Sequence, residues 1–191
     1  MPVENLILVG FMGAGKSTVG RVLARRLGRC FVETDDVICA REGRTIPDIF
    51  RLEGEARFRQ LEGEALEALA LKSGDVIATG GGLPCREGRM ARLRELGTVI
   101  WLKGDLAVAL ERARRSGARP MLAGRVPEEI EALYRQREPY YRNAHLTLDT
   151  TGLTIDQVVS RIQSMVRAGA GLHSRVAGAT ARGTSVPPSG A

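Results

Sequence analysis

Residues 10–17 of this 191-residue chain read Gly10-Phe11-Met12-Gly13-Ala14-Gly15-Lys16-Ser17, which fits the pattern G-x-x-x-x-G-K-[ST]. An apolar run, Leu6–Val9, precedes this stretch, and an amphipathic helical pattern over residues 16–27 follows it. Glycines allow backbone N–H groups to converge on phosphate oxygens, and the positive end of the following helix points at the same anion. In this pattern the lysine reaches the β- and γ-phosphates, and the serine hydroxyl binds Mg²⁺. The stretch therefore predicts a strand, a phosphate-binding loop and a helix.

The rest of the chain alternates short apolar runs with longer amphipathic ones. Strands are predicted at residues 6–9, 30–32, 76–78, 98–102 and 145–148. Helices are predicted at residues 16–27, 36–41 and 55–72, after the glycines at 80–82 to about 96, and at 106–115, 128–137 and 155–166. Such alternation is typical of parallel sheets covered by helices. We therefore expect an α/β fold of the P-loop kinase type, a three-layer sandwich with a five-stranded parallel sheet and helices on both faces.

Composition and charge place the chain among ordinary globular proteins. It has 28 Lys+Arg against 22 Asp+Glu, a net charge of +6, and 43% hydrophobic residues. The basic excess suggests a nucleic-acid partner, but residues 1–156 carry only +2 and only three of the cations are lysines, so we expect no such partner. From residue 169 the chain is rich in Gly, Ala, Ser, Thr and Pro, and hydrophobic anchoring stops. We expect one domain over residues 1–168 and a disordered tail over residues 169–191.

The sequence also bears on location and assembly. The N-terminus lacks the basic region of a signal peptide, and no apolar stretch approaches the roughly 20 residues that span a bilayer. The cysteines, Cys30, Cys39 and Cys85, form no CxxC pair, which argues against a disulfide framework or a zinc site. We therefore expect a cytoplasmic protein with no membrane partner, and we take a monomer as the default.

Residues after the second and third strands predict where a phosphoryl acceptor binds. The chain lacks N-K-x-D, the base-reading string of GTPases, and its small size favours a small-molecule kinase. Asp35 follows the second strand, where the loops of an open α/β sheet form the ligand crevice, so it is placed to accept a hydroxyl proton. Spacing alone equally fits a helix cap at Asp35 or Asp36. Gly80-Gly81-Gly82 follows the third strand, and either close approach of backbone to a ligand or a tight turn explains three consecutive glycines.

Together these motifs resemble the shikimate kinase family. The resemblance covers residues 6 to about 166, and the order and spacing of its strings are more specific than the phosphate loop alone. The strings are Gly10–Ser17, Thr34-Asp35, Gly43–Ile46 with Ile49-Phe50, Gly54-Glu55 with Phe58-Arg59, Gly80–Gly82, Arg119-Pro120 with Leu122, and Arg137 with Pro139-Tyr140. The resemblance implies transfer of the γ-phosphoryl group of ATP, with Mg²⁺, to the 3-hydroxyl of shikimate in aromatic amino-acid biosynthesis.

The resemblance also implies a role for each matching residue. Asp35 matches the acid that binds the shikimate hydroxyls and acts as base, and Arg59 and Arg137 match the pair that holds the shikimate carboxylate. A planar guanidinium binds a carboxylate through two parallel hydrogen bonds, so two of them orient a small acid strongly. Gly81 and Gly82 are expected to add backbone contacts to shikimate. The expected nucleotide-binding residues are Gly13, Ala14, Gly15, Lys16, Ser17, Thr18, Arg114 and Arg119, the expected metal ligand is Ser17, and the expected catalytic residues are Lys16, Asp35 and Arg119.

The segment 116–127 resembles the mobile lid of the family. Closure of such a lid would bring Arg119 over the γ-phosphate, where it neutralises developing charge and excludes water. Surface solvation is the alternative for any single arginine in this Arg-rich chain. The family packs an arginine on adenine, and this residue falls among Arg112, Arg114 and Arg115. The sequence does not decide between the three, and we carry Arg114 as the candidate.

One position departs from the family, and other functions stay open. Glu33 stands where the family usually has Asp, and its extra methylene changes its reach to Mg²⁺ or to a metal-bound water. Phe50 and Phe58 fit either the apolar wall beside the substrate ring or ordinary core packing. A gluconate kinase would keep the phosphate loop but has no reason to place the two arginines, and a polyanion-binding protein would use the basic tail instead.

Overall fold

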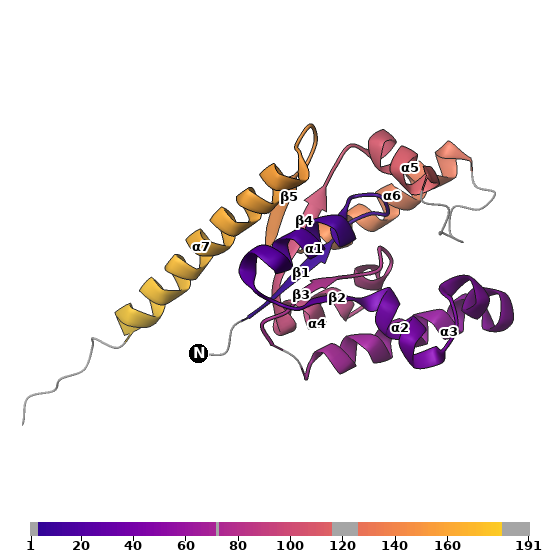
Figure 1. Cartoon of the computed structure of the whole chain (residues 1–191), viewed down its shortest axis with the longest axis horizontal. Coiled ribbons are helices and arrows are strands. Elements are labelled where there is room, and N and C mark those ends of the chain that lie inside the picture. Colours follow the sequence, from indigo (N-terminus) through magenta and orange to yellow (C-terminus); the bar gives the residue numbers. More distant parts are fainter. Residues whose placement is uncertain (1–3, 72, 116–125, 181–191) are drawn as a thin grey trace, which may run out of the picture.

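The computed structural model describes residues 4–71, 73–115 and 126–180, which fold around one parallel sheet (Figure 1). The strands are β1 (Asn5–Val9), β2 (Phe31–Glu33), β3 (Val76–Ala78), β4 (Gly97–Lys103) and β5 (Leu146–Asp149). They form a five-stranded sheet in the order β2-β3-β1-β4-β5, and every neighbouring pair is parallel. The predicted α/β fold is thus confirmed. Because all strands run the same way, their carboxyl ends meet at one edge, where ligands bind in such sheets.

Alternation along β1 divides the core into two layers. Ile7 and Val9 belong to one apolar cluster and Leu6 and Leu8 to another, since successive side chains of a strand point to opposite faces. The first cluster packs against α3 (Ile46–Leu69), α4 (Arg89–Leu96) and α6 (Pro127–Tyr141). The second packs against α1 (Lys16–Leu27) and α7 (Ile155–Thr180). Helices therefore cover both faces, as the apolar patterning predicts.

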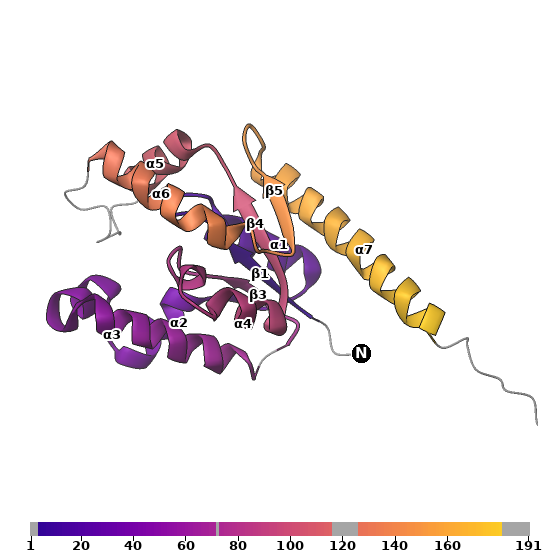
Figure 2. The same ribbon diagram turned by 180° about the vertical axis from the view of Figure 1, so that it is seen from behind.

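A smaller helical unit projects from the β2 edge of the sheet, as Figures 1 and 2 both show. It consists of α2 (Thr34–Glu42) and the first half of α3, and Phe58 from the second half completes its apolar core around Ile38 and Ile49. The helix α3 begins earlier than the predicted residue 55, because Thr45 caps it by accepting a hydrogen bond from Asp48 N at 3.3 Å. Its backbone is non-helical at Gly54 (φ 79°, ψ 179°), so the two halves of α3 meet at a kink.

Two helices run further than predicted. Helix α6 continues through Pro139 to Tyr141, although Pro139 has no N–H to donate to the carbonyl oxygen of Arg135. Helix α7 continues to Thr180, so residues 169–180, which we expected to be disordered, are helical, and Figure 1 shows this end leading away from the sheet. Val158, Val159 and Ile162 anchor the start of α7, and each further residue adds a backbone hydrogen bond once the helix is nucleated. The rest of the expected tail, residues 181–191, lies outside the described residues.

Further short elements connect the layers. A 3₁₀ turn, η1 (Leu83–Cys85), follows the three glycines and leads to α4, and α5 (Leu106–Arg115) follows β4. Helix α5 lies so close to the phosphate loop that a Cβ added at Gly13 would meet the carbonyl oxygen of Ala109 at 1.9 Å. Across the described ranges, no helix combines the length and apolarity needed to cross a membrane.

Candidate active site

The phosphate loop leaves β1 at Gly10 and delivers the chain into α1. Gly10, Gly13 and Gly15 have φ of 141°, 76° and 86°, a region that favours glycine. Lys16 is 6% exposed, and its Nζ donates to the carbonyl oxygens of Gly10 at 2.8 Å and Phe11 at 2.9 Å. The ammonium group therefore lies across the loop, beside the N-terminus of α1, where a phosphate group is favoured.

Ser17 and Glu33 lie next to each other at the ends of α1 and β2. The Ser17 hydroxyl donates to Oε1 of Glu33, and the other carboxylate oxygen forms an ion pair with Arg21 at 3.3 Å. The Glu33 carboxylate is thus in direct contact with the serine. Both groups offer oxygen atoms, the ligands that Mg²⁺ prefers. Within the described ranges there is no cluster of three or more acidic, His or Cys side chains that could hold a metal alone. These donors fit a Mg²⁺ ion that is held mainly by phosphate oxygens.

Asp35 lies in the first turn of α2, facing the first of the three glycines. A Cβ added at Gly80 would meet Asp35 Oδ1 at 2.7 Å and Glu62 Oε1 at 3.3 Å. The Gly80 N–H also donates to Thr34 Oγ1 at 2.9 Å, which ties the loop after β3 to the start of α2. The absence of a side chain at position 80 therefore allows the Asp35 carboxylate to approach the glycine backbone.

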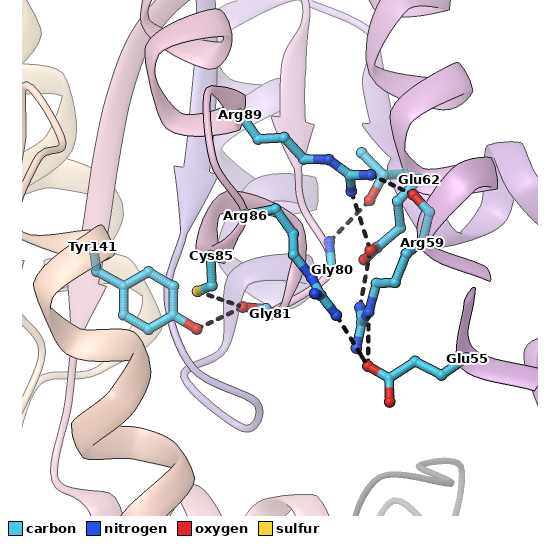
Figure 3. A network of polar contacts seen from close by, with 10 residues as sticks. Glu55, Arg59, Glu62, Gly80, Gly81, Cys85, Arg86, Arg89 and Tyr141 are labelled. Carbon is cyan, nitrogen blue, oxygen red and sulfur yellow. Dashed lines mark hydrogen bonds and ion pairs between the residues drawn. The ribbon is translucent and has the colours of Figure 1, made fainter. Parts of the chain in front are cut away.

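Arg59, on the second half of α3, is held by two carboxylates (Figure 3). Its Nη1 donates to Glu62 at 2.9 Å, while Nε and Nη2 donate to Glu55 Oε1 at 3.0 and 2.9 Å. Burial lowers the pKa of Arg59, but the two carboxylates outweigh burial and leave the pKa above its usual value. Glu62 is itself 1% exposed and also pairs with Arg89 at 3.3 Å. Arg89 in turn donates to the Arg59 carbonyl oxygen, so the backbone of Arg59 is fixed as well as its side chain.

Arg137 comes from α6 on the opposite side and meets Arg59 at the third glycine. It is 7% exposed, and its guanidinium lies 5.9 Å from the ring centroid of Phe11. A Cβ added at Gly82 would meet Arg59 Nη1 at 2.7 Å and Arg137 Nη2 at 3.3 Å. Two guanidinium groups from distant parts of the sequence therefore converge on one backbone position beside the phosphate loop. This arrangement suits a small carboxylate.

The carbonyl oxygen of Gly81, the second of the three glycines, is held by Tyr141 and Cys85. The Tyr141 hydroxyl, on a fully buried side chain, donates to the Gly81 carbonyl oxygen at 2.6 Å, and Cys85 Sγ lies 3.6 Å from the same oxygen (Figure 3). Burial raises the pKa of Tyr141 well above its usual value, so the hydroxyl keeps its proton and remains a donor. Burial likewise raises the pKa of Cys85, which stays a thiol near neutral pH. Both groups hold the glycine segment in place.

Two hollows flank the loops at this edge of the sheet. One, of about 460 Å³, is lined by both arginines of the site together with Glu55, Gly82, Cys85 and Arg86. The other, of about 270 Å³, lies beyond the phosphate loop and is lined by residues that include Gly15, Thr18, Thr150 and Leu153. The phosphate loop thus lies between a cationic cavity and a more apolar one.

The structure brings together most of the residues singled out from the sequence. Lys16, Ser17, Asp35, Arg59 and Arg137 lie around the same carboxyl edge with Gly81 and Gly82. Phe50 and Phe58 pack against each other at 4.8 Å between ring centroids, and both belong to the core of the α2–α3 unit. Arg119, the segment 116–125 and the side chain of Arg114 lie outside the described residues.

Sequence reasoning missed several partners of these groups, among them Glu62, Arg86, Arg89 and Tyr141. Glu62 had a usable signal, because it lies three residues after Arg59 on a helix, where side chains are neighbours. Arg86 and Tyr141 had none, since their contacts with Glu55 and Gly81 join segments far apart in sequence.

Comparisons with known proteins identify the family of this chain. The family model described as shikimate kinase matches residues 12–167. A shikimate kinase of Moorella thermoacetica is 44% identical over 164 residues, covering 86% of this chain and 95% of the relative. One from Geobacter sulfurreducens is 45% identical over 165 residues, covering 86% of this chain and 91% of the relative. The solved structure of a shikimate kinase from Acinetobacter baumannii in complex with shikimate superposes with a TM-score of 0.83 at 37% identity, covering 87% of this chain and 94% of that one. By sequence and by fold, this chain belongs to the shikimate kinase family.

Proposed function

We propose that this chain transfers the γ-phosphoryl group of ATP to the 3-hydroxyl of shikimate, giving shikimate 3-phosphate and ADP. The observation that carries the proposal is the convergence of Arg59 and Arg137 on Gly82, beside a phosphate loop. Shikimate is a small acid with one carboxylate and three hydroxyls. Two arginines that hold the carboxylate would fix the ring and direct one hydroxyl toward the loop, and positioning is most of what phosphoryl transfer needs.

At the nucleotide end, the loop and the start of α1 bind the phosphates. The backbone N–H groups of Gly13 to Thr18 surround the β-phosphate in this assignment, and Ala14 and Gly15 also line the apolar hollow beyond. Lys16 Nζ, now on two loop carbonyls, is within reach of a phosphate that enters the loop. Its charge then offsets the negative charge that the bridging oxygen gains as ADP leaves.

At the acceptor end, Asp35 acts as the general base. The 3-hydroxyl oxygen forms a bond to the γ-phosphorus, the bond from that phosphorus to the β,γ-bridging oxygen breaks, and the hydroxyl proton passes to the Asp35 carboxylate. Gly80 supports this role because its missing side chain leaves Asp35 Oδ1 next to the glycine segment. Gly81 and Gly82 border the same space and offer backbone contacts to the acceptor.

We assign Mg²⁺ as the metal that accompanies ATP. Ser17 Oγ is the protein ligand in this assignment, and Glu33, which accepts the Ser17 hydrogen bond, is a partner of the ion or of a water bound to it. When bound, the ion supplies positive charge to the β- and γ-phosphates. Arg119 and the Arg114 side chain, which lie outside the described part of the chain, remain proposed contacts of the γ-phosphate and of adenine, and the segment 116–127 remains the proposed lid.

We further propose that the chain works as a monomer in the cytoplasm and needs no nucleic acid or membrane. The charge distribution supports this, since the net charge of residues 1–156 is only +2. Four of the cations in that range, Lys16, Arg59, Arg119 and Arg137, are assigned to small anions. Size-exclusion chromatography with light scattering tests the monomer, and a larger mass in solution would contradict it.

A coupled assay for ADP release tests the proposed reaction. Purified chain with ATP and Mg²⁺ is given shikimate, gluconate or no acceptor, and we expect turnover with shikimate alone. Mass spectrometry of the product should show one added phosphoryl group. Turnover with gluconate but not shikimate would refute the proposal and favour another small P-loop kinase.

A further inference from the structure

Glu55 lines the cavity of about 460 Å³ that Arg59 and Arg137 also line, and Figure 3 shows its contacts with two arginines. A single oxygen, Oε1, accepts hydrogen bonds from Arg59 Nε at 3.0 Å, from Arg59 Nη2 at 2.9 Å and from Arg86 Nη2 at 3.3 Å. Arg59 and Arg86 come from α3 and from the end of η1, so Glu55 joins two sides of the cavity. The proposed function uses Arg59 and gives Glu55 no role.

The contact involves the atoms that a substrate would use. Nε and Nη2 form one side of the guanidinium, and a carboxylate binds there through two parallel hydrogen bonds. Glu55 is therefore a carboxylate of the protein, bound to one of the carboxylate-binding sides of Arg59. The hydrogen bonds from Arg59 lower the pKa of Glu55, so it is an anion at neutral pH, like the substrate group.

Glu55 and Glu62 differ in how freely they can leave Arg59. The Glu62 side chain is 1% exposed and is also held by Arg89, whereas the Glu55 side chain is 51% exposed. Ion pairs this exposed contribute little to stability, because water solvates the separated charges almost as well. Arg59 itself is 12% exposed, and a buried cation without a partner is costly. Glu62 is thus a permanent partner, and Glu55 is a partner that can be replaced.

We propose that Glu55 is the exchangeable counter-ion of the acceptor site, occupying Arg59 until the carboxylate of the acceptor displaces it. This inference rests on the proposed function, since it takes shikimate as the acceptor. On binding, the shikimate carboxylate takes over Nε and Nη2 of Arg59, and Glu55 moves outward onto Arg86 and water. Arg86, half-exposed at the rim, keeps Glu55 near the cavity so that it returns when the product leaves. Glu55 therefore lowers affinity for the acceptor and favours release.

Isothermal titration calorimetry of shikimate into the parent chain and Glu55→Gln tests the exchange. Glutamine keeps the size of the side chain and removes the charge that competes for Arg59. We expect Glu55→Gln to bind shikimate about two- to fivefold more tightly, the range of an exposed ion pair. Glu87→Gln is the matched control: Glu87 lines the same cavity, and among the described ion pairs it is not a partner of Arg59 or Arg86. It reports the general effect of removing one negative charge from the rim, and we expect a smaller change.

The outcomes separate the inference from the function on which it rests. Tighter binding by Glu55→Gln than by Glu87→Gln, with a lower KM for shikimate and an unchanged KM for ATP, supports the exchange. Equal or weaker binding by Glu55→Gln, while the parent chain still binds and phosphorylates shikimate, overturns the exchange and leaves the function standing. A parent chain that neither binds nor phosphorylates shikimate refutes the function, and the inference falls with it.

Discussion

Alanine at position 82 would disturb the two arginines without disturbing the fold. Gly82 has φ −90° and ψ −17°, a conformation that alanine adopts freely. Its new Cβ would lie 2.7 Å from Arg59 Nη1 and 3.3 Å from Arg137 Nη2, and ordinary contacts begin at 3.4 Å. The Arg59 guanidinium must therefore retreat by roughly 0.7 Å, and displacements of this order at a binding group cost about tenfold or more. We expect KM for shikimate to rise on the order of tenfold, about 1.4 kcal/mol of binding free energy.

Steady-state kinetics with each substrate varied in turn measures this effect. KM for ATP and the midpoint of thermal unfolding should stay near the parent values, since the three atoms nearest the added Cβ all belong to Arg59 and Arg137. Gly81→Ala is the matched control, because its Cβ would lie no closer than 3.5 Å to any atom and 3.8 Å from Arg137 Nη1. A KM for shikimate that is unchanged in Gly82→Ala, or raised equally in Gly81→Ala, would refute the reasoning that Arg59 and Arg137 hold the acceptor at this point.

Three further substitutions or deletions test other parts of the molecule. Asp35→Asn should lower kcat at least a hundredfold, since general-base catalysis contributes about 10²–10⁴-fold, while ATP binding measured by calorimetry stays unchanged. The control is Asp36→Asn at the exposed neighbouring residue. A rate for Asp35→Asn within a few-fold of the parent would disprove the assignment of Asp35 as the base. Tyr141→Phe should lower the free energy of unfolding, measured in urea, by about 1–2 kcal/mol, because it removes the buried donor to the Gly81 carbonyl oxygen. Tyr140→Phe, at a more exposed side chain, is the control, and equal stability of the two variants would contradict the role given to Tyr141. A chain that ends at Ala168 should keep full turnover, because Val158, Val159 and Ile162 anchor α7 well before that point, and loss of activity would mean that residues 169–191 take part in function.

The fold could be predicted where local signals and burial agree. Helix α1 has the predicted bounds, since Gly28 ends it in a left-handed conformation at φ 64°. Helix bounds were predicted less accurately where tertiary packing outweighs a local helix-breaking signal. Gly54 interrupts the helical pattern and has non-helical dihedrals. The chain is nevertheless helical both before and after Gly54, because Ile49 and Phe58 share one apolar cluster. Residues 169–180 are helical where we expected disorder, because the lack of buried anchors does not by itself end a helix that is already nucleated.

The candidate site could be predicted as a set of residue types but not as a network. Lys16, Asp35 and the arginines at 59 and 137 are visible as motifs at strand ends or on helices. Arg59 contacts Glu55 and Glu62, its neighbours four residues before and three after on α3, and helical spacing makes such pairs predictable. The contacts of Arg86 and Arg89 with the same two carboxylates depend on how α3 packs against η1 and α4, and no periodicity encodes them. The contact of Arg86 with Glu55 is the clearest example, since it joins two half-exposed side chains that lie 31 residues apart in the sequence.

The packing of Gly13 against α5 affects how sequence variation at the phosphate loop should be interpreted. A side chain at Gly13 would collide with the Ala109 carbonyl oxygen, a backbone atom that cannot rotate away, and would also need φ near 76°. Variants with a side chain at position 13 should therefore fail to fold, whatever their effect on catalysis. In a saturation mutagenesis experiment, position 13 would be as intolerant in a screen for abundance as in a screen for growth. Position 82 should be intolerant for growth alone, so comparing the two screens separates glycines required for packing from glycines required for substrate.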